Sequence, residues 1–171
     1  CIPGRRQQDK GQTMCLPCVP GKRNWNHGST ECVDCDAGQY QLDISGTDCK
    51  DCKPGMYQSK QGAAICNECQ QGKFQPSKGK STCNDCDKNT YSGELGATEC
   101  VTCDAGKITI TKGGSICNDC GLGKFGNVPG EECKLCPIGY SRKENNQEPT
   151  KCLLCQAGMT TLLPGLGSCS E

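Results

Sequence analysis

Cysteine recurs along this chain with a fixed period, and this period restricts the fold more than any other feature of the sequence. Twenty of the 171 residues are cysteine. We count the steps from Cys1 and then from the second cysteine of each C-x-x-C pair. The first seven steps are equally long, from the step between Cys1 and Cys18 to the step between Cys103 and Cys120. The eighth step is one residue shorter and the ninth is two residues longer, because the loop ending at Cys133 is shortened and the loop ending at Cys152 is lengthened. Internal repeats this regular predict a repeat architecture before local propensities are considered.

The spacing divides residues 1–171 into ten repeats with no linker between them, which predicts a single tandem array. Repeats 1 to 10 begin at Cys1, Cys18, Cys35, Cys52, Cys69, Cys86, Cys103, Cys120, Cys136 and Cys155. If each repeat forms one layer about 10 Å thick, the array is an elongated solenoid on the order of 100 Å long.

Apart from cysteine, the chain has too few apolar residues for an ordinary core. The hydrophobic fraction of 33% includes the cysteines, and roughly a fifth of the chain remains apolar without them, too little to bury a large core. Cross-links must therefore replace apolar burial. A disulfide that closes a loop of about 15 residues contributes roughly 3 kcal/mol in the chain-entropy model.

The cysteine content also indicates where the protein is located. Cysteine at this density is typical of proteins from oxidising compartments, so we expect an extracellular or cell-surface location. Nineteen basic and nineteen acidic residues cancel, and the absence of a basic stripe argues against nucleic acid binding. No run of about 20 apolar residues predicts a membrane span in this segment. The chain begins at Cys1 without a signal peptide, which we interpret as a mature or clipped part of a longer parent chain.

Each repeat reads C-x-x-G-x-Φ, a polar stretch, a second glycine and then C-x-x-C. The Φ position holds Tyr40, Tyr57, Phe74, Tyr91, Ile108 and Phe125 in the middle repeats, but Arg6 and Arg23 in the first two. Because glycine recurs where the backbone needs a positive φ, we predict left-handed turns at the first glycine column. That column includes Gly38, Gly55, Gly72 and Gly106, and its one exception is Asn89. Asparagine is the non-glycine residue that best tolerates this conformation, so Asn89 is interpreted as a structural substitute for glycine.

The second glycine column is predicted to adopt a positive φ as well. Its members are Gly11, Gly28, Gly46, Gly62, Gly79, Gly96, Gly113, Gly130 and Gly165, with Asn146 in the lengthened repeat. Two glycines about seven residues apart, with a short extended segment between them, indicate small hairpins. No helical stripe is sustained, so the predicted fold is small and disulfide-rich, with short β-hairpins, irregular loops and little or no helix.

Two disulfide schemes use all twenty cysteines, because spacing alone does not determine connectivity. In an interlocked scheme, alternate cysteines pair, for example Cys1–Cys18 with Cys15–Cys32. The local scheme is favoured, because it treats every repeat alike and keeps each insertion or deletion inside one loop. It pairs Cys1–Cys15, Cys18–Cys32, Cys35–Cys49, Cys52–Cys66, Cys69–Cys83, Cys86–Cys100, Cys103–Cys117, Cys120–Cys133, Cys136–Cys152 and Cys155–Cys169.

Zinc binding and redox catalysis are the rival interpretations of the C-x-x-C pairs. The spacing C-x2-C-x13-C-x2-C resembles a four-cysteine zinc site. However, nine pairs cannot be divided into four-cysteine sites without leaving one pair and both terminal cysteines over. A thioredoxin-like role would need a βαβ pattern, which is not present. We therefore predict no metal and no cofactor.

The pattern C-x-x-G-x-[YF]…G…C-x-x-C resembles the ephrin-receptor-like cysteine-rich repeats. The best-matching segments are CDAGQYQLDISGTDCKDC, CKPGMYQSKQGAAICNEC and CQQGKFQPSKGKSTCNDC. A looser similarity connects each loop to the first loop of tumour-necrosis-factor-receptor modules, whose local closure supports the local pairing here. The resemblance implies an extracellular, elongated, multi-repeat region of a cell-surface or matrix protein.

Several residues are candidates for contacts with other molecules. Trp25 belongs to no repeated column, and the last repeat exposes Met159, Leu162, Leu163 and Leu166 in a chain poor in such residues, which indicates an interface. A column of acids could form a calcium ladder, although a solvated face is the simpler interpretation; it comprises Asp34, Asp51, Glu68, Asp85 and Asp119. A Ser/Thr column is a candidate for O-linked sugar or for turn hydrogen bonds; it comprises Thr13, Thr30, Thr47, Ser81, Thr98, Ser115 and Thr150.

The residues also indicate a general function. No nucleophile–base pair or carboxylate dyad stands out, and a single histidine is present, so the chain is predicted not to be an enzyme. The predicted function is that of an extracellular stalk, spacer or filament subunit, with other protein chains as partners through self-assembly or a larger parent chain. The alternative is the ligand-binding ectodomain of a cell-surface receptor.

Overall fold

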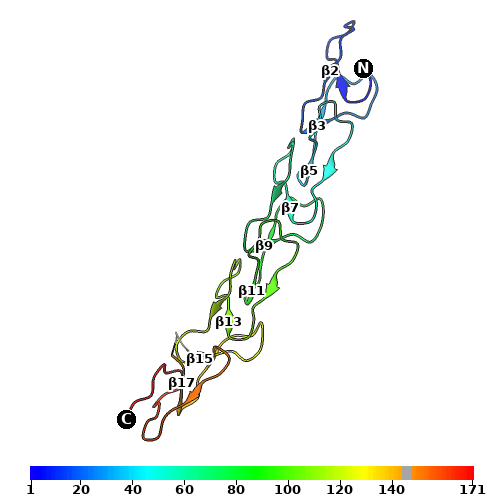
Figure 1. Cartoon of the computed structure of the whole chain (residues 1–171). Coiled ribbons are helices and arrows are strands. Elements are labelled where there is room, and N and C mark those ends of the chain that lie inside the picture. Colours follow the sequence, from blue (N-terminus) through cyan, green and yellow to red (C-terminus); the bar gives the residue numbers. More distant parts are fainter. Residues whose placement is uncertain (144–147) are drawn as a thin grey trace. The chain divides into compact units, whose positions relative to one another are not determined.

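The computed structural model of the protein describes residues 1–143 and 148–171, and within these ranges it consists of short hairpins without helix (Figure 1). Nine two-stranded sheets form, and each strand is two residues long. The strand pairs are β1 (Arg5–Arg6) with β2 (Leu16–Pro17), β3 (Lys22–Arg23) with β4 (Val33–Asp34), β5 (Gln39–Tyr40) with β6 (Lys50–Asp51), β7 (Met56–Tyr57) with β8 (Asn67–Glu68), β9 (Lys73–Phe74) with β10 (Asn84–Asp85), β11 (Thr90–Tyr91) with β12 (Val101–Thr102), β13 (Lys107–Ile108) with β14 (Asn118–Asp119), β15 (Lys124–Phe125) with β16 (Lys134–Leu135), and β17 (Tyr140–Ser141) with β18 (Leu153–Leu154). The predicted small, disulfide-rich hairpin fold is therefore confirmed.

A tight turn at each C-x-x-G sequence starts the hairpin. The amide of Gln39 donates to the carbonyl of Asp36 at 2.9 Å, and Gly38 between them has φ +86°. A glycine with positive φ at the third position is what a type II turn requires. The turn then places the first strand antiparallel to the residues of the next C-x-x-C, and Tyr40 pairs with Lys50.

The first-column residues have the left-handed backbone that their sequence pattern predicts. The φ values are +86° at Gly38, +79° at Gly55, +79° at Gly72, 60° at Asn89 and +81° at Gly106. Each of the ten disulfides closes one repeat on itself. They are Cys1–Cys15, Cys18–Cys32, Cys35–Cys49, Cys52–Cys66, Cys69–Cys83, Cys86–Cys100, Cys103–Cys117, Cys120–Cys133, Cys136–Cys152 and Cys155–Cys169.

The described residues group into two compact units. The N-terminal unit comprises Cys1–Asn84 and Glu94–Glu99, and the C-terminal unit comprises Asp85–Gly93 and Cys100–Glu171. The division falls inside repeat 6, whose loop tip belongs to the N-terminal unit. The repeat, rather than a separate globular domain, is thus the element from which both units are built.

Within the N-terminal unit, successive repeats are joined by the same backbone hydrogen bonds. The amide of Gly38 donates forwards to the carbonyl of Gln58 in the next repeat at 2.7 Å. The amide of Gly62 donates backwards to the carbonyl of Cys35 in the preceding repeat at 2.8 Å. The C-terminal unit uses the second type of bond too, from Gly113 to Cys86 at 2.8 Å and from Gly130 to Cys103 at 3.0 Å. Because buried backbone groups must be paired, each repeat depends on its neighbour to satisfy its own turn.

Glycines of the first column also lie very close to the backbone of the repeat two positions further along the chain. A Cβ atom on Gly38 would lie 2.2 Å from the carbonyl oxygen of Gly79, which belongs to repeat 5. The same contact would occur at 2.0 Å between a Cβ on Gly21 and the carbonyl oxygen of Gly62. These separations are far below van der Waals contact, so glycine is needed here for space as well as for its backbone conformation.

The core is made of disulfides and polar side chains rather than aromatic rings. Cysteines at the start of repeats 2 to 9 are at most 1% exposed, whereas Tyr40 and Tyr57 are half-buried. The residue after the Φ position is buried and polar in most repeats, and we call this set the polar column. Its buried members are Asn24, Gln41, Gln58, Gln75, Ser92, Thr109, Arg142 and Thr161.

Each glutamine of the polar column clamps the loop of its own repeat. The Gln58 side-chain amide donates to the carbonyl of Ile65 at 2.8 Å, and its oxygen accepts from the amide of Lys60 at 3.0 Å. Gln75 makes the equivalent bonds to Thr82 and Ser77 at 2.8 and 3.1 Å. A buried amide is tolerated because its donor and acceptor are both satisfied. The polar column therefore stabilises the loops that contain no regular structure.

The prediction for the second glycine column was wrong in repeat 3. Ser45, with φ 62°, adopts the left-handed conformation there and Gly46 does not. Ser45 also donates its amide to the carbonyl of Cys18 at 2.8 Å, as the glycines of the column do in other repeats. Gly46 is required for a different reason, because a Cβ there would lie 2.4 Å from Cγ of Gln41. Asn146, the other exception in this column, lies outside the described residues.

We expect that replacing Ser45 with glycine stabilises the N-terminal unit by about 0.5–1 kcal/mol, since a non-glycine residue in left-handed backbone costs about 1–2 kcal/mol. The matched control is Ser59→Gly, an exposed serine without positive φ, which should be neutral or slightly destabilising. Guanidinium unfolding with intact disulfides, followed by hydrogen exchange of repeats 2 to 4, measures both. Equal effects of the two substitutions would contradict the assignment of strain to Ser45.

Candidate functional site

The loop of repeat 2 forms a cleft of about 540 Å³ in the N-terminal unit. Its lining includes Trp25, His27, Glu31 and Val33. Trp25 is 49% exposed, and the guanidinium carbon of Arg23 lies 4.0 Å from the centroid of its ring. The structure thus places Trp25 at a concave, partly aromatic surface rather than in a packed core.

A change in the polar column explains why this loop is open. Asn24 has one methylene fewer than the glutamines of the following repeats. Its side-chain amide donates backwards to the carbonyl of Arg5 at 2.8 Å, and its oxygen accepts from Asn26 and from the hydroxyl of Ser29 at 2.9 and 2.8 Å. Gln58 bonds across its loop to the carbonyl of Ile65, whereas Asn24 bonds to Arg5 of the preceding repeat and to Asn26 and Ser29 near the start of its own loop. The rest of the loop is left open and forms the cleft.

The candidate interface residues of the last repeat lie on the surface of the C-terminal unit. Leu162 and Leu163 are 74% and 65% exposed, and Met159 and Leu166 are 41% and 39% exposed. Between Met159 and Leu166, the one buried residue is Thr161. This repeat therefore exposes several large apolar side chains within a short segment.

Asn89 differs from the glycines of its column in its hydrogen-bond partner. Its amide donates to the hydroxyl oxygen of Thr109 at 2.7 Å, whereas the amide of Gly38 reaches a backbone carbonyl. Gly139 bonds to the hydroxyl of Thr161 at 2.9 Å in the same way, and a Cβ on Gly139 would have no atom within 4 Å. In these two repeats a threonine hydroxyl of the polar column thus replaces the backbone carbonyl as the acceptor of the first-column amide.

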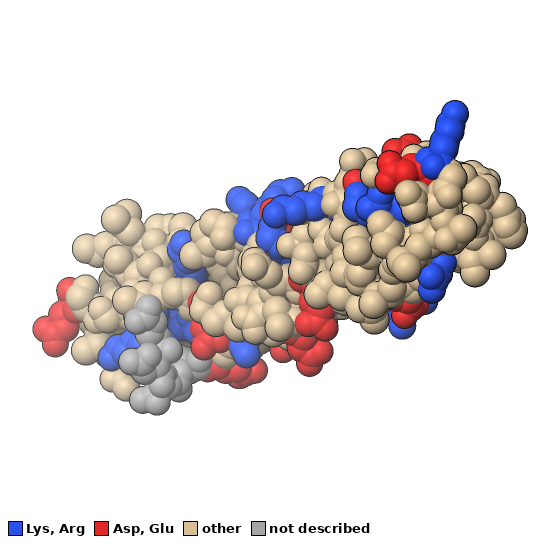
Figure 2. Space-filling model, turned by 90° about the horizontal axis from the view of Figure 1, so that it is seen from above, with Lys and Arg blue, Asp and Glu red and all other residues tan. Residues whose placement is uncertain are grey.

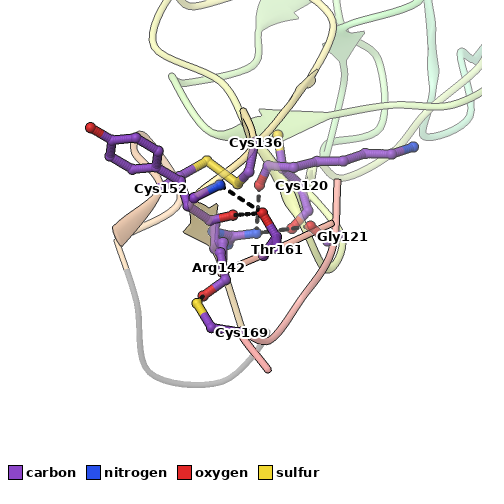
Figure 3. The surroundings of a disulfide bond; sticks show 11 residues. Cys120, Gly121, Cys136, Arg142, Cys152, Thr161 and Cys169 are labelled. Atoms are coloured by element: carbon purple, nitrogen blue, oxygen red, sulfur yellow. Dashed lines mark hydrogen bonds between the residues drawn. A yellow bond between two sulfur atoms is a disulfide. The ribbon is translucent and has the colours of Figure 1, made fainter. Parts of the chain in front are cut away.

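Arg142 is a buried, hydrogen-bonded part of the core, and its burial was not predicted from the sequence pattern (Figure 3). Its side chain is 0% exposed, and its Nη1 donates to the carbonyls of Cys120, Gly121 and Lys124, the latter two at 3.0 Å. Glutamine at the same position of other repeats bonds within its own loop. Arg142 instead reaches back into repeat 8, so it links repeat 9, which contains the lengthened loop, to the repeat before it. Its position, where every other repeat except repeat 8 has an amide or a hydroxyl side chain, was the signal available in the sequence.

Several charged groups pair at the surface, and both signs are interspersed on the face shown in Figure 2. Lys22 lies 2.8 Å from Asp34, its partner across β3 and β4. Lys112 lies 2.7 Å from Asp87, which raises the pKa of Lys112 through a hydrogen bond and its negative charge. Among the described residues, no group of three or more His, Cys, Asp or Glu side chains is placed to hold a metal ion.

Comparison with known families identifies the repeat. A family profile described as "Tyrosine-protein kinase ephrin type A/B receptor-like" matches two overlapping segments, residues 21–65 and residues 57–99. Residues 21–99 are thus similar to ephrin-receptor-like repeats. The resemblance expected from the C-x-x-G-x-[YF] pattern is confirmed over this part of the chain. No curated protein matches the chain.

Ephrin-receptor-like repeats are a non-catalytic, extracellular type of domain, which agrees with the ten disulfides of this chain. In the described ranges, the chain contains no helix with the length and apolar character to cross a membrane. The disulfides and the family match are both typical of extracellular proteins.

Proposed function

We propose that this chain is an extracellular structural segment that acts as a stalk, spacer or filament subunit of a cell-surface or matrix assembly. The observation that supports this function is the repetition of the bonds between repeats, such as Gly38 to Gln58 and Gly62 to Cys35. Their geometry is nearly constant along the N-terminal unit, so each added repeat extends the stack by the same step. Stability in such an array grows with the number of neighbour contacts.

Small-angle X-ray scattering and negative-stain imaging of the secreted protein test the spacer function. A spacer is expected to show a maximum dimension on the order of 100 Å, if each repeat adds about 10 Å. Deletion of residues 35–68, which removes repeats 3 and 4 and keeps the period, should shorten it by about 20 Å. A compact particle, or a length that does not change with the deletion, would contradict a spacer.

We further propose that the apolar residues of the last repeat form the contact between subunits. Exposed apolar residues within one segment are typical of surfaces that bind other proteins. Replacing Leu162 and Leu163 with serine should reduce self-association, measured by light scattering over a range of concentrations. Ile110→Ser is the matched control, since Ile110 and Leu162 are both 74% exposed. A wild-type chain that stays monomeric at every concentration would exclude self-assembly through this surface.

The Ser/Thr column stays a proposed position for O-linked sugar. Its members in repeats 1, 2 and 3 are Thr13, Thr30 and Thr47, and all three are exposed. Mass spectrometry of the secreted protein before and after removal of O-linked glycans detects the modification.

A further inference from the structure

The three arginines that are not fully buried and the single tryptophan of the chain lie in repeats 1 and 2. The chain has four arginines, of which Arg5, Arg6 and Arg23 belong to these repeats. The fourth, Arg142, is 0% exposed and bonds to backbone carbonyls. Every other basic residue apart from His27 is lysine. Because tryptophan and arginine are the residues that most often dominate binding energy at protein interfaces, this concentration marks repeats 1 and 2 as different from the rest.

The hairpins of these two repeats have an inverted pattern. Arg6 on β1 pairs with Leu16 on β2, and Arg23 on β3 pairs with Val33 on β4. Leu16 and Val33 are 48% and 47% exposed. In repeats 3 and 4 the ring is on the first strand and a polar residue is on the second. These pairs are Tyr40 with Lys50 and Tyr57 with Asn67. The inversion therefore places arginine beside exposed aliphatic side chains in both of the first two hairpins.

The guanidinium groups of Arg6 and Arg23 have no carboxylate partner among the described residues. The contact that Arg23 makes is its stacking on Trp25, and Nε of Arg23 has no hydrogen-bond acceptor within the described ranges. The neighbouring Lys22, in contrast, is already paired with Asp34 at 2.8 Å. Arginine presents a planar fork of five donors that matches a carboxylate in two parallel bonds. Nε of Arg23 is buried, but Arg6 and Arg23 are only partly buried as residues, so their remaining guanidinium donors are available to an acidic group from outside.

Two adjacent clefts give this surface its shape. The cleft of about 540 Å³ contains Trp25 and Val33, and a second cleft of about 290 Å³ contains Arg6 and Val19. Glu31 borders both clefts. Val19 is 55% exposed, so apolar area is accessible in the second cleft as well. The first hollow thus has an aromatic and apolar side formed by Trp25, on which Arg23 stacks, and Val33, and the second has a cationic and an apolar side.

We propose that this surface, formed by Arg6, Val19, Arg23, Trp25 and Val33, binds an acidic segment of another extracellular protein. The carboxylates of the segment pair with Arg6 and Arg23, and an apolar or aromatic side chain between them lies against Trp25 and Val33. Residues 1–35 carry five basic and three acidic side chains, whereas the whole chain is neutral. The net positive charge of these repeats complements an acidic partner and speeds its approach.

Panning a phage-displayed library of random dodecapeptides on the folded, disulfide-bonded chain tests the proposal. The selected peptides are expected to share at least two Asp or Glu residues near a Trp, Phe or Leu. A synthetic peptide of the consensus sequence then serves as the probe in binding measurements. Trp25→Ala should weaken its binding about 30-fold, as for a typical interface hot spot. Arg6→Lys and Arg23→Lys should each weaken it about tenfold, since lysine keeps the charge but loses the two-bond geometry.

The matched control is Leu42→Ala, which truncates an apolar residue of repeat 3 that is 57% exposed. It should leave binding unchanged, and circular dichroism with a count of free thiols verifies that all variants fold. Selected peptides without acidic residues, equal binding by the Trp25→Ala variant, or no selected peptide at all would overturn the proposal. The proposal would also be overturned if the chain binds a heparin column and the Arg→Lys variants bind it equally well, because this result assigns the surface to a sulfated polysaccharide.

Discussion

Gly38→Ala is expected to prevent the N-terminal unit from reaching its native structure. The new Cβ would lie 2.2 Å from the carbonyl oxygen of Gly79. The Cβ is bonded directly to the backbone and the oxygen belongs to it, so neither atom can move away without breaking other bonds. Gly38 is buried, and its amide also bonds to Gln58. A backbone clash of this kind adds to the cost of left-handed alanine, so we expect a loss of at least about 4 kcal/mol. Secreted yield and free thiols on non-reducing mass spectrometry report the effect.

Gly139→Ala is the matched control for this prediction. Gly139 has φ +81°, but a Cβ there would meet no atom within 4 Å. The substitution therefore costs only the backbone strain, about 1–2 kcal/mol. Asn89→Gly should be close to neutral, because the backbone conformation is retained and the bond to Thr109 comes from the main chain. If Gly38→Ala and Gly139→Ala are equally mild, the contact between a repeat and the next but one is not essential.

Arg142→Ala is expected to destabilise repeats 8 and 9 by about 3 kcal/mol. The substitution removes hydrogen bonds from a charged donor, each worth about 1.5–3 kcal/mol, and leaves the carbonyls of Cys120 and Gly121 without this partner. It also opens a cavity at a fully buried position. Hydrogen exchange of the amides between residues 120 and 136 should accelerate by roughly 100-fold, while exchange in the N-terminal unit stays unchanged.

Two further variants separate the causes. Arg142→Met keeps most of the volume but removes the donors, so it should lose most of the same stability if hydrogen bonds dominate. Arg6→Ala removes an arginine that makes no hydrogen bond or ion pair within the described residues, and its effect should stay within about 0.5 kcal/mol. An Arg142→Ala variant with wild-type exchange in repeats 8 and 9 would show that the contact between these two repeats does not depend on this side chain.

The local features of the fold were predictable because they arise from short stretches of sequence. The turn at Gly38 needs only a left-handed residue three positions after a cysteine, and Asn89 marks the same requirement. Local pairing such as Cys35–Cys49 follows the boundaries of each repeat. The second glycine of repeat 3 shows the limit of this approach. Ser45 and Gly46 are adjacent, and the sequence pattern did not reveal which of them is left-handed.

The repeat, its turns and its hairpins were predictable from the sequence, because they depend on cysteine spacing and on backbone geometry within a single repeat. Two features became visible in the three-dimensional structure alone: which polar residues form the core, and the close approach of another repeat that excludes a Cβ atom from the first glycine column. Gln58 is 7% exposed although it is polar, and Gly38 meets Gly79, which lies two repeats further along the chain. Arg142 likewise finds its acceptors in the preceding repeat. Such contacts depend on how repeats stack, and stacking is set by the summed packing of neighbours rather than by any local pattern.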